Sequence, residues 1–327
     1  MHKNKQCSPT LCKTIIDIVF ILLIAFVVRT FVFGIYHVPT GSAEPNLLVG
    51  DRIWGNKMVY MMQKPQRGDQ AMFSDPEFVY STNSLQKMWQ KYVGISLFGV
   101  LPAGPNNWVK RVIAVPGDTI EGRVEEGRAV LYLNGEHLEE SYVNPYPLLR
   151  VRKNTGFVSP HSFFARIVPS ILHSKTKEVM YTVDLSIPLA DQPYYAITPD
   201  EVVTDKWVGT PIMEPADKAW YLFDRTHPEK HYTVDEFGPF TVPEGKLWVQ
   251  GDSRHNSHDS RFVGFVDQEL LLGRASVILF SLDSEEPFWF LALLQNPITF
   301  FTNIIRWNRV LKPLWGIPDL RLESKGV

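Results

Sequence analysis

The segment WVKRVIAVPGD, residues 108–118, predicts a β-strand that ends in a tight turn, because an apolar, β-branched run precedes Pro-Gly-Asp. Side chains alternate along a strand, so Lys110 shares one face with Trp108, Val112 and Ala114. Burial on this apolar face disfavours the charged ammonium and predicts a lowered pKa for Lys110. The opposite face, which carries Arg111, is expected to meet solvent. The alternative for Lys110 is a surface position on an edge strand, with its charged head in water.

Outward from this strand, further apolar runs bounded by turn residues predict a mostly β fold. They are residues 71–73 after Arg67-Gly68-Asp69, AVLYL (129–133) before Asn134-Gly135, KLWVQ (246–250) and RASVILF (274–280). The last two bracket a long polar loop. Between residues 141 and 240 the pattern loosens, with many Pro, Tyr and His residues and no helical period. This stretch is predicted to be an inserted second domain.

Composition limits the classes of function. The chain has 327 residues, of which 45% are hydrophobic and 21% charged, which is typical of a globular protein. Its 33 basic and 35 acidic residues nearly balance, so no binding to nucleic acid is expected. Both cysteines, Cys7 and Cys12, lie in the first dozen residues, so the main body has neither an internal disulfide nor a cysteine-built metal site.

The segment TIIDIVFILLIAFVVRTFVF, residues 14–33, has about the ~20 residues that a transmembrane helix needs. The alternatives are a cleaved secretory signal and a buried core helix. Bulky residues at 29–33 do not fit the small-residue pattern of a cleavage site, which favours an uncleaved anchor. Residues 1–13 are basic and contain no acid, so they are expected to be cytoplasmic and everything after residue 33 to lie outside.

The C-terminal tail, residues 285–327, is rich in aromatic and aliphatic residues but is broken by polar ones and by Pro297. It is predicted to lie at the membrane interface. The residues expected to hold it there are Trp289, Trp307, Arg306 and Arg309. Ordinary packing against the catalytic domain is the equally weighted alternative.

Two other segments carry chemistry: PTGSAEPNLLVGDRI (39–53) and GDSRHNSHDSRFVGFV (251–266). A serine hydroxyl is a weak nucleophile until a neighbouring base removes its proton. Ser42 lies beside Gly41, in a bend of small residues where a substrate can approach the backbone. A turn without chemistry is the alternative reading of this bend.

In this order, the three segments resemble the serine, lysine and Gly-Asp boxes of bacterial type I signal peptidases, and residues 67–69 resemble a further box. The resemblance covers the anchor and roughly residues 30–75, 108–140 and 241–282. It implies a signal-peptidase-like β catalytic core in two parts, 34–140 and 241–284, around the inserted domain 141–240. It also implies a single-pass protein of the plasma (inner) membrane, with its catalytic domain on the outer face.

The resemblance implies a role for each matching residue. Ser42 is the nucleophile, Lys110 the base, and Ser257 the hydroxyl that orients the lysine. The backbone N–H of Ser42 and the hydroxyl of Thr40 are the expected oxyanion donors. Expected substrate-binding residues are Val38, Pro39, Ala43, Leu47, Trp108 and Val109, and expected supporting residues are Gly251, Asp252, Asp259 and Arg261, the last two as an ion pair.

The chain departs from the family pattern at three positions. Thr40 stands where a serine is more familiar, Ala43 where methionine is usual, and Ser253 where asparagine is commoner. The change at Thr40 is mild because threonine also donates a hydrogen bond. Ala43 is expected to enlarge the pocket for the residue before the scissile bond and to relax or shift substrate preference.

The function implied is a membrane-bound endopeptidase that removes N-terminal signal peptides from exported preproteins by Ser-Lys acyl-enzyme hydrolysis. The strand at 33–38 is expected to bind the peptide as an added strand. The expected partners are signal peptides and membrane lipid, with the secretion translocon as a further candidate, and no cofactor or metal is expected.

Three alternatives stay open. A Ser-His dyad would use His255 or His258 as the base. The same two histidines suggest a metal site, but they lack the further ligands that zinc needs. A paralogue with this fold would bind secretory peptides without cutting them or would process a restricted substrate set.

Overall fold

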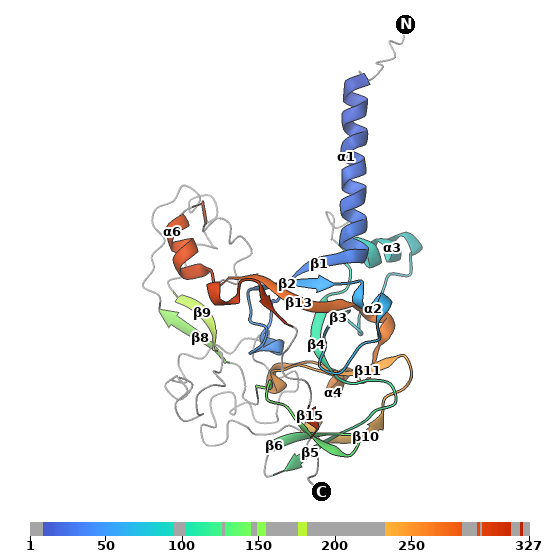
Figure 1. Ribbon diagram of the computed structural model, residues 1–327, viewed down its shortest axis with the longest axis vertical. Helices are drawn as coiled ribbons and strands as arrows, with labels where there is room; N and C mark the ends of the chain where they lie inside the picture. Colours follow the sequence, from blue (N-terminus) through green and yellow to red (C-terminus); the bar gives the residue numbers. More distant parts are fainter. Residues whose placement is uncertain are drawn as a thin grey trace.

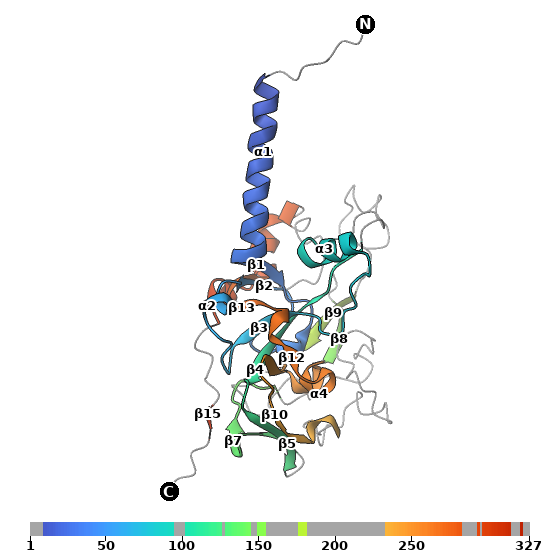
Figure 2. The same cartoon turned by 90° about the vertical axis from the view of Figure 1, so that its right-hand side faces the viewer.

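The protein is described here from a computed structural model that covers residues 9–94, 102–125, 128–144, 149–154, 176–181, 233–282, 293–294, 296–314 and 321–322. These residues are mostly β, as the sequence predicts, and form two larger sheets and a hairpin. Helix α1 (Pro9–Val27) projects from the β body in both views (Figures 1 and 2).

The first sheet contains the residues that the sequence singles out. Its strands lie in the order β1 (Phe33–His37), β2 (Asp51–Asn56), β13 (Leu271–Ser281), β3 (Gln70–Ser74), β4 (Asn107–Ala114), β11 (Lys246–Gln250) and β12 (Val266–Asp267), with β14 (Lys312–Pro313) also paired to β13. The pairings are antiparallel. The strands predicted at 71–73, 108–115, 246–250 and 274–280 are confirmed, with small shifts at their ends.

Strand β4 lies inside this sheet and has apolar clusters on both faces. Its pairing with β3 places Lys110 opposite Ala71 and Val109 opposite Met72. Ala71 belongs to a cluster with Val112. Met72 belongs to a different cluster, against which Val109 packs. Because both faces are covered, every residue from Lys110 to Ala114 is buried.

The second sheet has the order β10 (Phe237–Thr241), β5 (Thr119–Glu125), β6 (Arg128–Leu133), β7 (Glu136–Glu139) and β15 (Arg321–Leu322). The predicted Asn134-Gly135 turn joins β6 to β7, and both residues have positive φ, 55° and 82°. Leu133 packs with Ile113 and Trp248, so one apolar cluster joins the two sheets.

Strands β5–β7 therefore lie in the second sheet, although their residues belong to the stretch assigned from sequence to the catalytic core. Most of the predicted inserted domain, 141–240, lies outside the described residues. The described parts include residues 141–144, strand β10 and the antiparallel hairpin of β8 (Leu149–Asn154) and β9 (Thr176–Tyr181).

The remaining described elements are short helices: η1 (Val28–Val32), η2 (Gly41–Ala43), α2 (Val59–Met62), α3 (Ser84–Tyr92), η8 (Thr233–Asp235), η9 (Arg254–Asn256), α4 (Ser260–Val263), η10 (Gln268–Leu270), α6 (Pro297–Thr299), η11 (Phe300–Ile304) and η12 (Trp307–Arg309). In the part of the chain that the structure describes, no helix combines the length and apolar character required to cross a membrane.

Candidate active site

Ser42 lies in η2, the single helical turn between β1 and β2. The turn is closed by the N–H of Glu44, which donates to the carbonyl of Gly41 at 3.0 Å. Thr40 precedes it in an extended conformation and is exposed. The N–H of Ser42 lies in the first turn of this helix, where a backbone donor has no acceptor within the helix itself. The half-buried Ser42 therefore presents a backbone donor beside its hydroxyl.

Lys110 lies in β4, which packs against η2, and only 5% of its surface is exposed. Burial lowers the pKa of Lys110 to about 8, although the nearby carboxylate of Asp259 partly opposes the shift. The Nζ atom lies 5.9 Å from the ring centroid of Trp108, on the same face of β4. The apolar face predicted for Lys110 is confirmed, and an edge-strand position in water is excluded.

No hydrogen bond joins Ser42 to Lys110 within the described part of the chain. Catalytic hydrogen bonds are often long or misaligned before substrate binds, so this geometry is compatible with a nucleophile and base that meet in the complex. What the structure does establish is the contact between the turn that carries Ser42 and the strand that carries Lys110.

Gly251 separates the backbone of Ser42 from the side chain of Ser257. A Cβ at position 251 would lie 2.5 Å from the Ser42 carbonyl oxygen and 2.2 Å from the Ser257 hydroxyl oxygen. The N–H of the next-but-one residue, Ser253, donates to the same carbonyl at 3.2 Å. Only glycine fits this close approach, so the loop 251–257 packs directly on the Ser42 turn.

The hydroxyl of Ser257 is buried and has no hydrogen-bond partner among the described residues. Unpaired buried hydroxyls are uncommon because each one costs free energy. The position of Ser257 against Gly251, next to the Ser42 turn, thus leaves one hydrogen-bonding group available at the site.

Asp259 and Arg261 form a buried ion pair in which Nε of Arg261 lies 2.9 Å from Oδ1 of Asp259. Asp259 also accepts the N–H of Gly251 at 3.0 Å. Burial raises the pKa of Asp259, but Arg261 outweighs this effect and holds the pKa at about 2. The carboxylate is therefore charged and keeps a fixed negative charge near Lys110.

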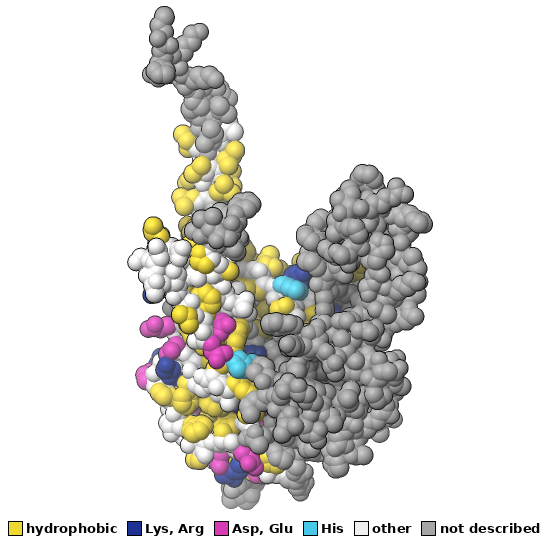
Figure 3. Space-filling view, turned by 180° about the vertical axis from the view of Figure 1, so that it is seen from behind, with side chains coloured by type: hydrophobic (Ala, Val, Ile, Leu, Met, Phe, Trp, Pro, Cys, Tyr) yellow, Lys and Arg dark blue, Asp and Glu magenta, His cyan; other side chains and the backbone are white. Residues whose placement is uncertain are grey.

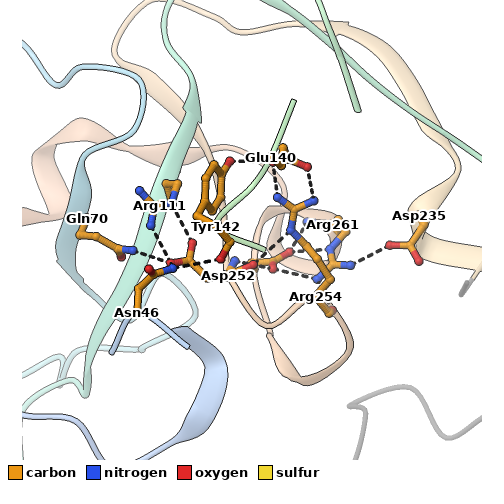
Figure 4. Close-up of polar contacts among 11 residues, drawn as sticks. Asn46, Gln70, Arg111, Glu140, Tyr142, Asp235, Asp252, Arg254 and Arg261 are labelled. Carbon is orange, nitrogen blue, oxygen red and sulfur yellow. Dashed lines mark hydrogen bonds and ion pairs between the residues drawn. The ribbon is translucent and has the colours of Figure 1, made fainter. Parts of the chain in front are cut away.

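A second buried carboxylate, Asp252, joins the loop to β4 (Figure 4). Arg111 donates to both of its oxygens, from Nε at 2.8 Å and from Nη2 at 2.7 Å. The side-chain amides of Gln70 and Asn46 donate to Oδ2 at 2.7 and 2.8 Å. The expectation that Arg111 faces solvent is wrong: its exposed fraction is 1%, because Asp252 comes from the far loop to pair with it.

The ion pairs continue on the other side of the loop. Arg254 donates to both carboxylate oxygens of Glu140, and Arg261 donates to Asp235 at 2.7 Å. Arg261 also donates to the backbone carbonyl of Arg254 at 2.7 Å. The loop 251–261 is thus held by charges from three separate parts of the chain.

The residues expected to bind substrate fall into two groups. Val38, Ala43 and Leu47 are buried together in one cluster, and the half-buried Val109 packs against it. Trp108 lies on the other face of β4 with Phe73 and Val112, while Pro39 is exposed. The structure therefore does not bring Trp108 to the cluster that contains Ala43.

The histidine alternatives have little support among the described contacts. Nε2 of His258 lies 2.9 Å from Oε2 of Glu77, and its ring packs on Trp108 and Phe262. His255 has a side chain outside the described part. Among described residues, no group of three or more His, Cys, Asp or Glu is placed to hold a metal ion.

Sequence reasoning missed several residues that support the site. Glu44 is buried directly after Ala43; burial raises its pKa to about 8, although the Val49 N–H partly opposes this. Asn46 links the Ser42 loop to Asp252, and Arg111 joins that carboxylate to β4. The available signal was the charged Arg111 in a mostly apolar strand, on the face opposite Lys110, since such a residue needs either water or a buried partner.

Proteins of known family are similar to this chain over most of its length. A family model described as signal peptidase, peptidase S26, matches residues 11–280. Signal peptidase I of Aquifex aeolicus (strain VF5) is 30% identical, covering 92% of this chain and 98% of that protein. Signal peptidase I of Haemophilus influenzae is 25% identical over 82% of this chain and 69% of that protein, and that of Buchnera aphidicola subsp. Schizaphis graminum is 24% identical over 88% and 80%.

Replacing Arg111 by methionine is expected to lower the free energy of unfolding by about 3–5 kcal/mol, because the buried Asp252 loses its charged partner. Chemical unfolding of the full chain measures the loss. The double variant Arg111→Met/Asp252→Leu is expected to recover part of it. Arg123→Met is the control, because its pair with Glu121 is more exposed and worth little. Equal losses from the two single variants would contradict the buried-pair account.

Proposed function

This chain belongs to the signal peptidase family, peptidase S26, and we propose that its activity, the removal of signal peptides by a serine endopeptidase, is carried by Ser42 and Lys110. The observation that supports this most is the burial of Lys110 beside the Ser42 turn, with a pKa lowered to about 8. A lysine with this pKa is neutral in a useful fraction of molecules near neutral pH and can accept a proton.

The proposed reaction has two steps. The Ser42 oxygen attacks the scissile carbonyl carbon while Lys110 takes the hydroxyl proton and then gives it to the leaving amine, which breaks the C–N bond. This leaves an ester between Ser42 and the signal peptide. Lys110 next takes a proton from water, the resulting hydroxide attacks the ester, and the proton returns to the Ser42 oxygen.

The remaining site residues have supporting parts in this proposal. Ser257, whose buried hydroxyl has no other described partner, orients the amine of Lys110. The Ser42 N–H and the Thr40 hydroxyl donate to the oxyanion. Asp252, Asp259 and Arg261 hold the loop that carries Ser257 against the Ser42 turn.

Strand β1 is proposed to bind the substrate backbone. It is the outermost strand of the first sheet and pairs only with β2 among the described strands. An open strand edge can add an extended peptide by main-chain hydrogen bonds. Val38 follows this strand, so the cluster of Val38, Ala43, Leu47 and Val109 lies next to where the bound peptide would run, and it supplies the apolar wall for the residue before the scissile bond.

We also propose that the N-terminal segment anchors the protein in the plasma (inner) membrane, with the amino terminus in the cytoplasm and the body outside. From Ile16 to Ile24 the large apolar side chains of α1 are exposed. Hydrophobic side chains lie along its described part on the face drawn in Figure 3. Apart from Asp17, the exposed side chains of this stretch are apolar and need an apolar surrounding, which lipid supplies in this proposal. We propose membrane lipid and the secretion translocon as partners of the protein in this position.

The assignment of nucleophile and base is tested by cleavage of a preprotein with the intact chain, Ser42→Ala and Lys110→Ala. Both variants are expected to lose nearly all activity, and the intact chain to cut after a small-x-small sequence, because each variant removes a group that takes part in bond formation. Ser84→Ala and Lys87→Ala, two exposed positions in α3, are the matched controls. Unchanged rates for either active-site variant would mean that its role is assigned to the wrong residue.

The pH dependence of kcat/KM follows from the lowered pKa of Lys110. Only the neutral amine accepts a proton, so kcat/KM is expected to rise tenfold per pH unit below about 8 and to level off above it. Steady-state rates between pH 6 and 10 measure this profile. A rise that continues to pH 10 would show an unshifted lysine, and a midpoint near 6.5 would favour a histidine base.

A further inference from the structure

The C-terminal residues 296–314 pack on the first sheet, beside the loop that follows Ser42. Three backbone bonds join them to β13: Arg306 N–H to Ser281 O at 3.0 Å, Leu311 N–H to Leu279 O at 3.3 Å, and Leu314 N–H to Ser276 O at 2.9 Å. Leu314 is buried in the cluster that contains Ala43 and Leu47. This segment is therefore part of the folded core around Ser42.

Two arginines of this segment bind the loop that follows Ser42, residues 44–51. Arg309 donates from Nη2 to the Asn46 carbonyl at 2.8 Å and pairs with Asp51 through Nε at 3.1 Å and Nη2 at 2.5 Å. Arg306 donates from Nη1 to the Val49 carbonyl at 2.7 Å. Arg309 is only 7% exposed and Asp51 is fully buried, so Arg309 does not reach lipid headgroups as the sequence had suggested.

The loop is held on its opposite side by the network around Asp252. The side-chain amide of Asn46 donates to Asp252, while its carbonyl accepts from Arg309. The N–H of Leu47 donates to the carbonyl of Ala43 at 2.9 Å, so the fixed loop continues directly into the Ser42 turn. Asn46 is thus fixed between the C-terminal segment and the strand that carries Lys110.

We infer that Arg309, assisted by Arg306, is a positioning residue: it fixes the loop after Ser42 and thereby the place of the Ser42 hydroxyl relative to Lys110. This inference rests on the proposed function, in which Ser42 is the nucleophile. A displacement of about 1 Å at a reacting group can cost roughly 10²-fold in rate, so loosening the loop lowers kcat without removing a catalytic group. Arg309 contacts Asn46 and Asp51 and is not among the residues proposed to touch substrate, so kcat is expected to change more than KM.

The test compares the full-length protein with Arg309→Lys. Lysine keeps a positive charge beside Asp51, which protects folding, but its single ammonium does not reproduce the fork that binds Asp51 and Asn46 together. We expect kcat to fall about tenfold or more, with KM changed by less than about twofold. Amide hydrogen exchange at Leu47, Leu48 and Gly50, all hydrogen-bonded donors in this loop, is expected to accelerate. Arg306→Met is expected to act in the same direction.

Two controls separate positioning from stability. Lys312→Met removes an exposed basic residue of the same segment that does not touch the loop, and is expected to leave kcat and exchange unchanged. Leu133→Ala creates a cavity in the cluster between the two sheets and is expected to lower Tm without changing kcat in assays well below Tm.

The inference would be overturned by unchanged kcat and exchange in both arginine variants, or by a lower Tm alone, as in Leu133→Ala. A rise in KM at constant kcat would also contradict positioning. Failure of the proposed function itself is recognised separately, because Ser42→Ala would then remain active whatever the exchange measurement gives.

Discussion

The burial of Lys110 is the constraint on which the rest of the site depends. An ammonium in an apolar strand loses its hydration, and here the nearby Asp259 offsets only part of that loss. A shift from 10.5 to about 8 lowers the free energy of unfolding by roughly 3 kcal/mol at neutral pH, where the buried lysine is charged. The penalty is relieved as the pH rises from about 8 toward the unfolded value. The fold must supply this free energy elsewhere, and it does so with two covered faces of β4 and with the second sheet that packs beside them.

The two carboxylates that act on Lys110 are each paired with an arginine. Arg111 forms an ion pair with Asp252, and Arg261 forms one with Asp259. Buried pairs of this kind are weak contributors to net stability but strongly penalise any arrangement that separates them. Their effect is to specify one position for the loop 251–261. The C-terminal segment does the same for the loop after Ser42, through Arg309 and Asp51. The proposed nucleophile and base are thus held in place by ion pairs that have no part in the proposed reaction.

Local patterns in the sequence predict the strands well because alternation and turn chemistry act over a few residues. Lys110, its apolar face and the Asn134-Gly135 turn follow from such patterns. The long-range pairs do not: Arg111 meets Asp252 across 141 positions, and Arg309 meets Asp51 across 258. A charged residue in a strand was read as facing water because a buried partner is invisible without the fold. The second sheet does not follow from local patterns for a similar reason, since its strands β5 and β10 pair across most of the region 141–240.

The most direct test of this account is the titration of Lys110 itself, followed by isotope-edited NMR of lysine side chains in the full-length protein. The Lys110 signal is assigned by its loss in Lys110→Arg. The account predicts that the Lys110 signal titrates near 8, well below the ~10.4 of an unperturbed lysine. A Lys110 signal that titrates at about 10.4 would contradict the account, because an unshifted lysine has almost no neutral amine near neutral pH to serve as the base for Ser42.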